Sequence, residues 1–184
     1  MTDKPAGYIP PHQVQILYSV EDISKAVHRL AIEIHEKLGE EFMLVALLKG
    51  SFVFTADLVR ALHAIGCAPQ IDFMTLASYG KNKTGASEIT VQRDLSEDVA
   101  GKHVLIVDDI LESGRTLQYA RELLMERGAI ATSIGVLMEK PGKRVIDSVD
   151  ADFTGFVIPD RFVVGYGLDY ANYYRELPFI GALD

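Results

Sequence analysis

Apolar and polar positions follow two different periods along the chain, and its first third shows both. From Ile23 to Leu38 apolar residues recur every three or four positions, which predicts an amphipathic helix that ends at Gly39. The run FMLVALL, residues 42–48, is apolar throughout, as is typical of a strand buried on both faces of a sheet. Residues 51–66 return to helical spacing, so a second helix is expected after the strand.

The limits of this second helix and the segments after it are also marked in the sequence. Ser51 is expected to cap the helix and Gly66 to end it. Residues 71–79, IDFMTLASY, alternate in the manner of a strand. The polar, glycine-punctuated stretch 80–88 predicts a mobile loop, from which residues 89–92 would return as a strand.

The second half of the chain repeats the order of strand, turn, helix and strand. An apolar strand begins at residue 104, a helix is predicted for 116–128 and another strand for 130–138, with short strands near Phe156 and Val163. Strands that alternate with helices pair in parallel through right-handed crossovers. The sequence therefore predicts an α/β fold, with an open, mainly parallel twisted sheet flanked by helices on both faces.

Length and composition limit the possible classes of protein. The chain has 184 residues, of which 48% are hydrophobic, so we expect a single domain spanning 1–184 with one sizeable core. The net charge of -8 argues against a nucleic-acid groove, which needs clustered cations. Cys67 is the only cysteine, and no apolar run approaches the roughly 18 residues of a membrane span. We expect a cytoplasmic protein without nucleic-acid or membrane partners.

Adjacent carboxylates follow the apolar strand that begins at residue 104. Ligands of open parallel sheets bind beyond the carboxyl ends of the strands, and Asp108 and Asp109 are expected at such an end. Ser113, Gly114 and Thr116 come where the next helix begins, so free backbone amides and two hydroxyls could cradle a phosphate, with glycine allowing close approach. Together these residues predict a site for a phosphorylated sugar.

Other phosphate-binding and signalling motifs fit less well. The chain contains no GxxxxGK[ST] segment, which argues against a P-loop NTPase. In GYGLDY, Tyr170 takes the place of the third glycine of a dinucleotide-binding fingerprint. A phospho-receiver domain would also show VLIVDD and a later Lys140-Pro141, but only one helix and one strand separate the two, which leaves no strand for the phosphorylated aspartate.

The stretch VLIVDDILESGRTL resembles the phosphoribosyl pyrophosphate (PRPP) motif of the type I phosphoribosyltransferases. LLKGSF, SYG, LMEKP, PDRFVVGYGLDY and YYRELP resemble, in the same order, the other blocks of the hypoxanthine-guanine branch, over roughly residues 45–175. The resemblance implies that family's fold, with a small hood from the N-terminal segment and about 159–184. It also implies purine salvage, in which the 5-phosphoribosyl group passes from PRPP to N9 of hypoxanthine or guanine, giving IMP or GMP and pyrophosphate.

The resemblance also implies roles for single residues and a Mg²⁺ cofactor. Ribose and its 5′-phosphate would be bound by Asp108, Asp109, Ser113, Gly114, Arg115 and Thr116. Pyrophosphate would be bound by Lys49, Gly50, Ser78, Tyr79 and Arg175, with a cis peptide between Leu48 and Lys49. The purine would meet Lys140, Phe162, Val163 and Asp169, and Mg²⁺ would meet Asp169, Asp108 and Asp109. A lysine donor favours an oxo group over an amine on the purine.

Glu112 departs from the family, which usually has aspartate here as the acid/base facing purine N7. Glutamate can carry out the same proton transfer, but its extra methylene shifts the carboxylate, and a displacement of about 1 Å can cost on the order of 100-fold in rate. Read without the resemblance, Glu112 favours the helix N-terminus electrostatically. We predict that Glu112 is catalytic. The alternative is a PRPP- or nucleotide-binding regulatory protein of the same fold with little or no activity.

The resemblance further implies a mobile loop, about 79–88, that closes over the reactants with Ser78 and Tyr79. It also implies a homodimer or homotetramer. The ranking of hypoxanthine, guanine and xanthine remains open at this point.

Overall fold

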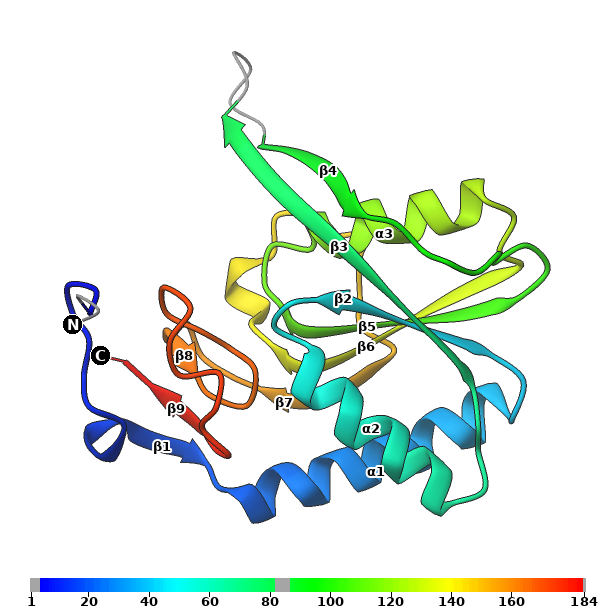
Figure 1. Ribbon diagram of the computed structural model, residues 1–184. Coiled ribbons are helices and arrows are strands. Elements are labelled where there is room, and N and C mark those ends of the chain that lie inside the picture. Colours follow the sequence, from blue (N-terminus) through cyan, green and yellow to red (C-terminus); the bar gives the residue numbers. More distant parts are fainter. Residues whose placement is uncertain (1–3, 82–86, 184) are drawn as a thin grey trace.

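A six-stranded sheet with helices on both faces forms the body of the molecule in the computed structural model (Figure 1). The structure describes residues 4–81 and 87–183, and their side chains outside 78–88. In chain order the elements are η1 (Pro11–Gln13), β1 (Gln15–Tyr18), α1 (Val20–Leu38), β2 (Met43–Leu48), α2 (Phe52–Ala64), β3 (Gln70–Lys81), β4 (Ser87–Arg93), β5 (His103–Leu111), α3 (Arg115–Glu126), β6 (Ala131–Glu139), η2 (Pro141–Lys143), β7 (Phe153–Val157), β8 (Val163–Val164) and β9 (Ile180–Ala182).

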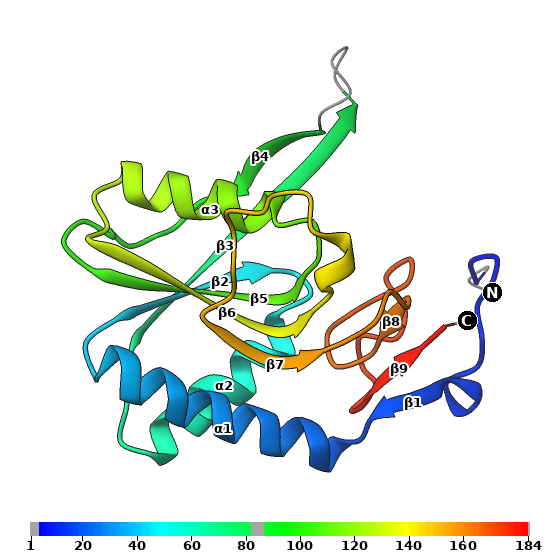
Figure 2. The same ribbon diagram turned by 180° about the vertical axis from the view of Figure 1, so that it is seen from behind.

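The main sheet has the strand order β4-β3-β2-β5-β6-β7. Strands β3, β2, β5, β6 and β7 pair in parallel, and only β4 runs antiparallel to its neighbour. Helices α1 and α2 pack on one face of the sheet and α3 on the other (Figures 1 and 2). The prediction of an open, mainly parallel α/β sheet covered on both faces is confirmed.

Strict alternation along the central strands explains why both faces of the sheet are buried. In β2, Leu44 and Ala46 join the cluster under α1 and α2, whereas Met43 and Val45 join the cluster under α3. Successive side chains of a strand point to opposite faces, so an all-apolar strand needs a cover on each side. The uninterrupted apolar run seen in the sequence is thus the signature of a central strand.

The terminal segments form a second, smaller sheet of order β1-β9-β8, in which all pairs are antiparallel. Figure 1 shows β1 and β9, from the two terminal segments, side by side in this sheet. Tyr174, which is fully buried, ties the segments together, because its hydroxyl donates to the Ile9 carbonyl and accepts from the Ile9 amide, both at 2.7 Å. The predicted hood is confirmed, and we use that name for this small sheet and the loop between β8 and β9.

Strands β3 and β4 reach further than the sequence indicated. The loop was predicted from residue 80 to 88, but β3 continues to Lys81 and β4 starts at Ser87. The returning strand predicted at 89–92 lies within β4. Residues 82–86 lie outside the described part, so the mobility predicted for the loop stays a prediction.

Two local predictions about helix α2 and strand β5 need correction. Ser51 stands at the N-cap position of α2 but does not cap it; its hydroxyl turns back and donates to the Leu47 carbonyl at 2.5 Å. Strand β5 does not end before the two aspartates, since Asp108 pairs with Val136 and the strand continues to Leu111. The neighbouring strand β2 pairs with β5 only as far as Val107. The aspartates therefore lie where β5 has lost one of its two neighbours.

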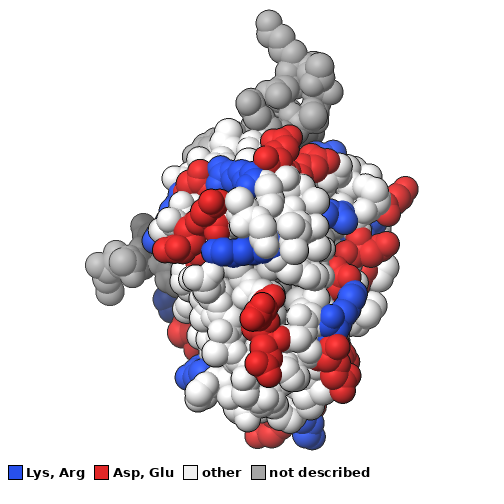
Figure 3. Space-filling view, turned by 90° about the vertical axis from the view of Figure 1, so that its right-hand side faces the viewer, with Lys and Arg blue, Asp and Glu red and all other residues white. Residues whose placement is uncertain are grey.

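Charged side chains and the apolar character of the helices can be compared with the composition of the chain. Figure 3 shows one face of the molecule, on which acidic and basic side chains are interspersed rather than gathered in a basic stripe. Among the described residues, no helix combines the length and the apolar character that crossing a bilayer requires.

Gly165, in the loop that follows β8, offers a direct test of how the hood is held. Its φ is +93°, and an added Cβ would lie 2.1 Å from the carbonyl oxygen of Phe179. We expect Gly165→Ala to lower the free energy of unfolding by about 2–4 kcal/mol, from backbone strain and overlap together. Gly142→Ala is the control, because a Cβ added there would meet nothing within 4 Å. Urea denaturation measures both; equal stability of the two variants would contradict this account of the hood.

Candidate active site

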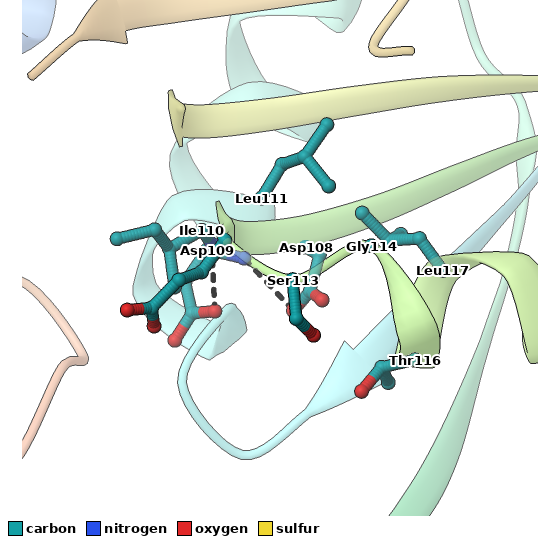
Figure 4. A pocket seen from close by; sticks show the side chains of 9 residues that line it. Asp108, Asp109, Ile110, Leu111, Ser113, Gly114, Thr116 and Leu117 are labelled. Carbon is teal, nitrogen blue, oxygen red and sulfur yellow. Dashed lines mark hydrogen bonds between the residues drawn. The ribbon is translucent and has the colours of Figure 1, made fainter. Parts of the chain in front are cut away.

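A cavity of about 250 Å³ opens where β5 leads into α3. It is lined by Asp108, Asp109, Ile110, Leu111, Glu112, Ser113, Gly114, Thr116 and Leu117. In Figure 4 the carboxylates of Asp108 and Asp109 and the hydroxyls of Ser113 and Thr116 lie on one side of the strand-to-helix turn, whereas Leu111 points to the other side. The acids and hydroxyls predicted to bind a sugar phosphate thus share one cavity.

The two aspartates are adjacent and partly buried. Desolvation raises the pKa of Asp108 well above its usual value, and the neighbouring charge of Asp109 raises it further. Desolvation also raises the pKa of Asp109, although hydrogen bonds and the positive charge of Arg175 partly oppose the rise. The backbone amide of Asp109 donates to Asp108 Oδ1 at 2.9 Å, and that of Ile110 donates to Asp109 Oδ1 at 2.7 Å. Those bonds fix one oxygen of each carboxylate in place.

The loop between β2 and α2 lies against Asp109. An added Cβ on Gly50 would fall 1.6 Å from Asp109 Oδ2, so only glycine permits this approach. The Leu48–Lys49 peptide bond is cis, as the resemblance implied. Lys49 is exposed at the edge of the site. The predicted pyrophosphate residues Lys49 and Gly50 are therefore neighbours of the predicted ribose residues.

At the start of α3 the Arg115 amide donates to Ser113 Oγ at 3.4 Å. Gly114 occupies the N-cap position with φ +82° and has no side chain to cap the helix. The carbonyl of Ser113 accepts from the amides of Val145 and Ile146, at 3.0 and 3.1 Å, which fixes the turn from the other side. Free amides at a helix N-terminus bind anions readily. The geometry fits a phosphate.

The reason for glycine at position 114 differs from the one expected. The sequence suggests close approach of the ligand, but an added Cβ would meet Ile146 Cβ and its carbonyl oxygen, both at 3.3 Å. The left-handed backbone and the segment behind the turn require glycine here. Arg115 is the first residue of α3 and does not line the cavity.

A second cavity of about 400 Å³ adjoins the first. It is lined by Asp109, Ile110, Glu112, Lys140, Lys143, Asp160, Phe162, Val163, Leu168 and Asp169. Lys140 is buried, at 6% exposure, although it carries a charge, whereas Phe162 exposes 50% of its surface. A buried lysine needs partners, and an exposed aromatic ring offers a stacking surface. All four residues predicted to meet the purine line this cavity.

Glu112 and Asp109 line both cavities, so they lie where the two meet. Glu112 Oε1 lies 3.7 Å from Lys140 Nζ, and the glutamate side chain keeps 45% of its surface exposed. If one ligand filled both cavities, the bond between its two parts would lie at this point. Glu112 is therefore placed beside the bond between the two halves of such a ligand.

The loop after β8 brings Asp169 and Arg175 to the same site. Arg175 Nη2 lies 2.6 Å from Asp169 Oδ1, and Arg175 Nη1 donates to the Gly167 carbonyl at 2.6 Å. An added Cβ on Gly167 would lie 2.3 Å from the Gly50 carbonyl oxygen, so this loop touches the one between β2 and α2. Segments from three distant parts of the sequence thus converge at the two aspartates.

The remaining predicted residues are only partly placed. Ser78 and Tyr79 belong to β3, but their side chains lie outside the described part of the structure. Sequence reasoning missed Lys143 and Asp160, which line the second cavity and form an ion pair of 2.8 Å. Asp160 lies within PDRFVVGYGLDY and Lys143 lies two residues after LMEKP, but nothing in either stretch indicates that they would meet.

The donor set can be tested against the Mg²⁺ that the resemblance implied. Within the described residues no group of three His, Cys, Asp or Glu side chains is close enough to hold a metal by itself. Mg²⁺ is usually held by one or two carboxylates together with waters and substrate phosphates. Asp108 and Asp109 are desolvated acids whose charge a cation would relieve, and Asp169 offers a further carboxylate. The residues fit a magnesium ion that arrives with a phosphorylated substrate.

Comparison with known proteins places this geometry in a family. The model of the phosphoribosyl transferase domain matches residues 13–171. The chain is 43% identical over 173 residues to the hypoxanthine phosphoribosyltransferase of Salmonella typhimurium, covering 92% of this chain and 95% of that protein. It is 41% identical over 174 residues to the hypoxanthine-guanine phosphoribosyltransferase of Bacillus subtilis, covering 94% of each.

A solved structure agrees with the sequence relatives. The crystal structure of a hypoxanthine phosphoribosyltransferase from Staphylococcus aureus matches with a TM-score of 0.86 at 38% identity, over 94% of this chain and 93% of that one. The chain therefore belongs to the phosphoribosyl transferase domain family. Within this family it falls in the hypoxanthine and hypoxanthine-guanine phosphoribosyltransferase group, because relatives from that group match more than nine tenths of its length.

The raised pKa of Asp108 predicts that the site costs stability. A carboxyl whose pKa is raised by folding makes its full contribution to stability only below its unfolded pKa of about 3.9. That contribution to the free energy of unfolding is lost as the pH rises through the raised pKa of the folded state. Asp108→Asn keeps the acceptor oxygen but removes the charge, so at pH 7.5 it should stabilise the protein by about 1 kcal/mol, or about 2–4 °C in Tm. Urea denaturation at pH 7.5 and pH 4 would measure the gain, which should shrink at the lower pH.

Asp94→Asn is the matched control for this prediction. Its hydrogen bond with Arg127 lowers the pKa of Asp94, so the same substitution should destabilise the protein at pH 7.5. A loss of stability in Asp108→Asn at pH 7.5 would contradict the proposed desolvation of the pair.

Proposed function

We propose that this chain is a purine salvage enzyme that transfers the 5-phosphoribosyl group from PRPP to N9 of hypoxanthine or guanine, giving IMP or GMP and pyrophosphate. The main support is the pair of adjoining cavities that share Asp109 and Glu112. One is lined by acids, hydroxyls and helix amides, and the other by a buried lysine and an exposed aromatic ring. This division matches a substrate pair of sugar phosphate and base.

In this proposal the first cavity holds the ribose phosphate of PRPP. Ser113, Gly114 and Thr116 bind the 5′-phosphate with hydroxyls and free amides at the positive end of α3. Asp108 and Asp109 accept hydrogen bonds from the ribose hydroxyls. Because the turn and the strand are both fixed by backbone hydrogen bonds, the sugar carbon that reacts is held toward the second cavity.

The second cavity selects the base. Lys140 donates to the exocyclic oxygen at C6, and a lysine cannot accept a hydrogen bond from the amine of adenine. Phe162 stacks on the ring, and the backbone of Val163 meets the ring edge. The buried position of Lys140 supports this selection, since an amine in place of the oxygen would set a hydrogen-bond donor against the buried ammonium.

The reaction forms the bond from N9 to C1′ as the bond from C1′ to the pyrophosphate oxygen breaks, and pyrophosphate leaves with the electron pair. Glu112 accepts the proton that N7 loses as N9 becomes bonded. Lys49, Gly50 and Arg175 bind the leaving pyrophosphate. Mg²⁺, when bound, adds positive charge to the pyrophosphate group, and Asp169, Asp108 and Asp109 are the residues that would hold it.

Turnover tests the proposal directly. Purified protein, PRPP and Mg²⁺ are mixed with hypoxanthine, guanine, xanthine or adenine, and nucleotide formation is followed by absorbance and chromatography. We expect IMP and GMP but no AMP, and activity should be lost with EDTA. Absence of turnover with every 6-oxopurine would refute the proposed enzyme. We further propose a homodimer or homotetramer in the cytoplasm, and light scattering would test the assembly.

A second candidate function is a PRPP- or nucleotide-binding regulator with little activity, which Glu112 in place of aspartate keeps open. Glu112→Gln separates the two, because it removes the proton acceptor but keeps the shape of the side chain. For an enzyme, kcat should fall by about 100-fold or more while the Kd for PRPP, measured by calorimetry, stays nearly constant. A regulator would bind PRPP without turnover, and the substitution would change neither property.

A further inference from the structure

The outer wall of the purine cavity carries an ion pair that the proposed function does not use. Lys143 Nζ lies 2.8 Å from Asp160 Oδ2, and both side chains are about half exposed, at 46% and 56%. Both line the cavity together with Glu112, Lys140 and Phe162. An ion pair this exposed adds little to stability, because water screens the attraction between its charges. Its position suggests a role in the site.

Lys143 lines the same cavity as the proposed proton acceptor, Glu112. The hydrogen bond and charge of Asp160 raise the pKa of Lys143, and the negative charge of Glu112 adds to the rise. Glu112 Oε1 has Lys140 Nζ at 3.7 Å, and Asp160 holds the ammonium of Lys143 in the wall of the same cavity.

The backbone that carries both lysines is anchored. Lys140 donates its amide to the Leu111 carbonyl at 2.9 Å, directly before Glu112, and Lys143 donates its amide to the Lys140 carbonyl at 3.2 Å. The next residue, Arg144, forms an ion pair of 2.5 Å with the partly buried Glu139. The distance from the lysine backbones to residue 112 is therefore set by strand β5 and by the short η2 turn, not by a free loop.

We infer that Lys143, held by Asp160, is a positioning residue that directs the carboxylate of Glu112 toward the base. The inference rests on the proposed function, because it assigns Glu112 the proton from N7. A glutamate has one more rotatable bond than an aspartate, so its carboxylate can occupy more positions. Lys140 lines the purine cavity and donates to the base in the proposed function. Lys143 supplies a second cation, from the outer wall of the cavity, that limits the positions of the Glu112 carboxylate.

Steady-state kinetics of Lys143→Gln test this inference. Loss of one partly exposed charge contact should lower kcat for IMP formation about fivefold and change the KM for hypoxanthine and PRPP by less than about twofold. Lys143→Arg keeps the charge and should recover at least about half of the wild-type kcat. Lys25→Gln, which removes an exposed lysine of α1, is the matched control and should behave as wild type.

A double-mutant cycle distinguishes positioning from a general structural effect. On the background of Glu112→Gln, Lys143→Gln should have no further effect on kcat, since it acts through the glutamate. Asp160→Asn should lower kcat in the wild type but not in Lys143→Gln. Additive effects in either pair, or an unchanged kcat in Lys143→Gln, would overturn the inference while leaving the proposed function intact. A wild-type protein without turnover would refute the proposed function, and the inference with it.

Discussion

Two adjacent carboxylates, partly withdrawn from water at one end of a buried strand, are the constraint on which the rest of the site depends. Desolvation raises the pKa of both Asp108 and Asp109. The charge of Asp109 raises the pKa of Asp108 further, whereas hydrogen bonds and the charge of Arg175 partly oppose the rise at Asp109. Carboxyls with pKa values perturbed in this way are concentrated at functional sites. Strand β5 keeps its pairing with β6 through this region while β2 has already ended, so the backbone stays ordered and one side is free for a ligand.

Close backbone contacts make the site out of segments far apart in the sequence. Gly50 permits the loop after β2 to touch Asp109, and Gly167 permits the loop after β8 to touch Gly50. Neither contact would survive a side chain, as the overlaps at an added Cβ demonstrate. Through these contacts the hood is joined to the end of the main sheet, so the purine cavity and the phosphate cavity have common walls at Asp109 and Glu112.

The features that could be predicted from the sequence depend on local interactions, whereas those that were missed depend on contacts between distant residues. Helix α1 and strand β2 follow from local periodicity, and the predictions for both are confirmed to within a few residues. The hydroxyl of Ser51 bonds to Leu47 instead of capping its helix, and the backbone at Gly114 packs against the segment around Ile146. The Lys143–Asp160 pair was missed as well. Each of these depends on a neighbour whose position is known only once the chain is folded, so residue type and spacing could not reveal it.

The extra methylene of Glu112, relative to aspartate, must be accommodated by either the backbone or the side chain. The backbone cannot absorb its extra methylene, since β5 is paired up to Leu111 and Ser113 is held by two amides from the segment behind it. The additional length must therefore be taken up by the side chain, which is half exposed and has Lys140 Nζ at 3.7 Å. Cations on the opposite wall are the simplest way to restrict that freedom, because they act on the carboxylate at a distance and need no change in the packed turn. A longer acid in this site is thus best explained together with the lysines that line its cavity.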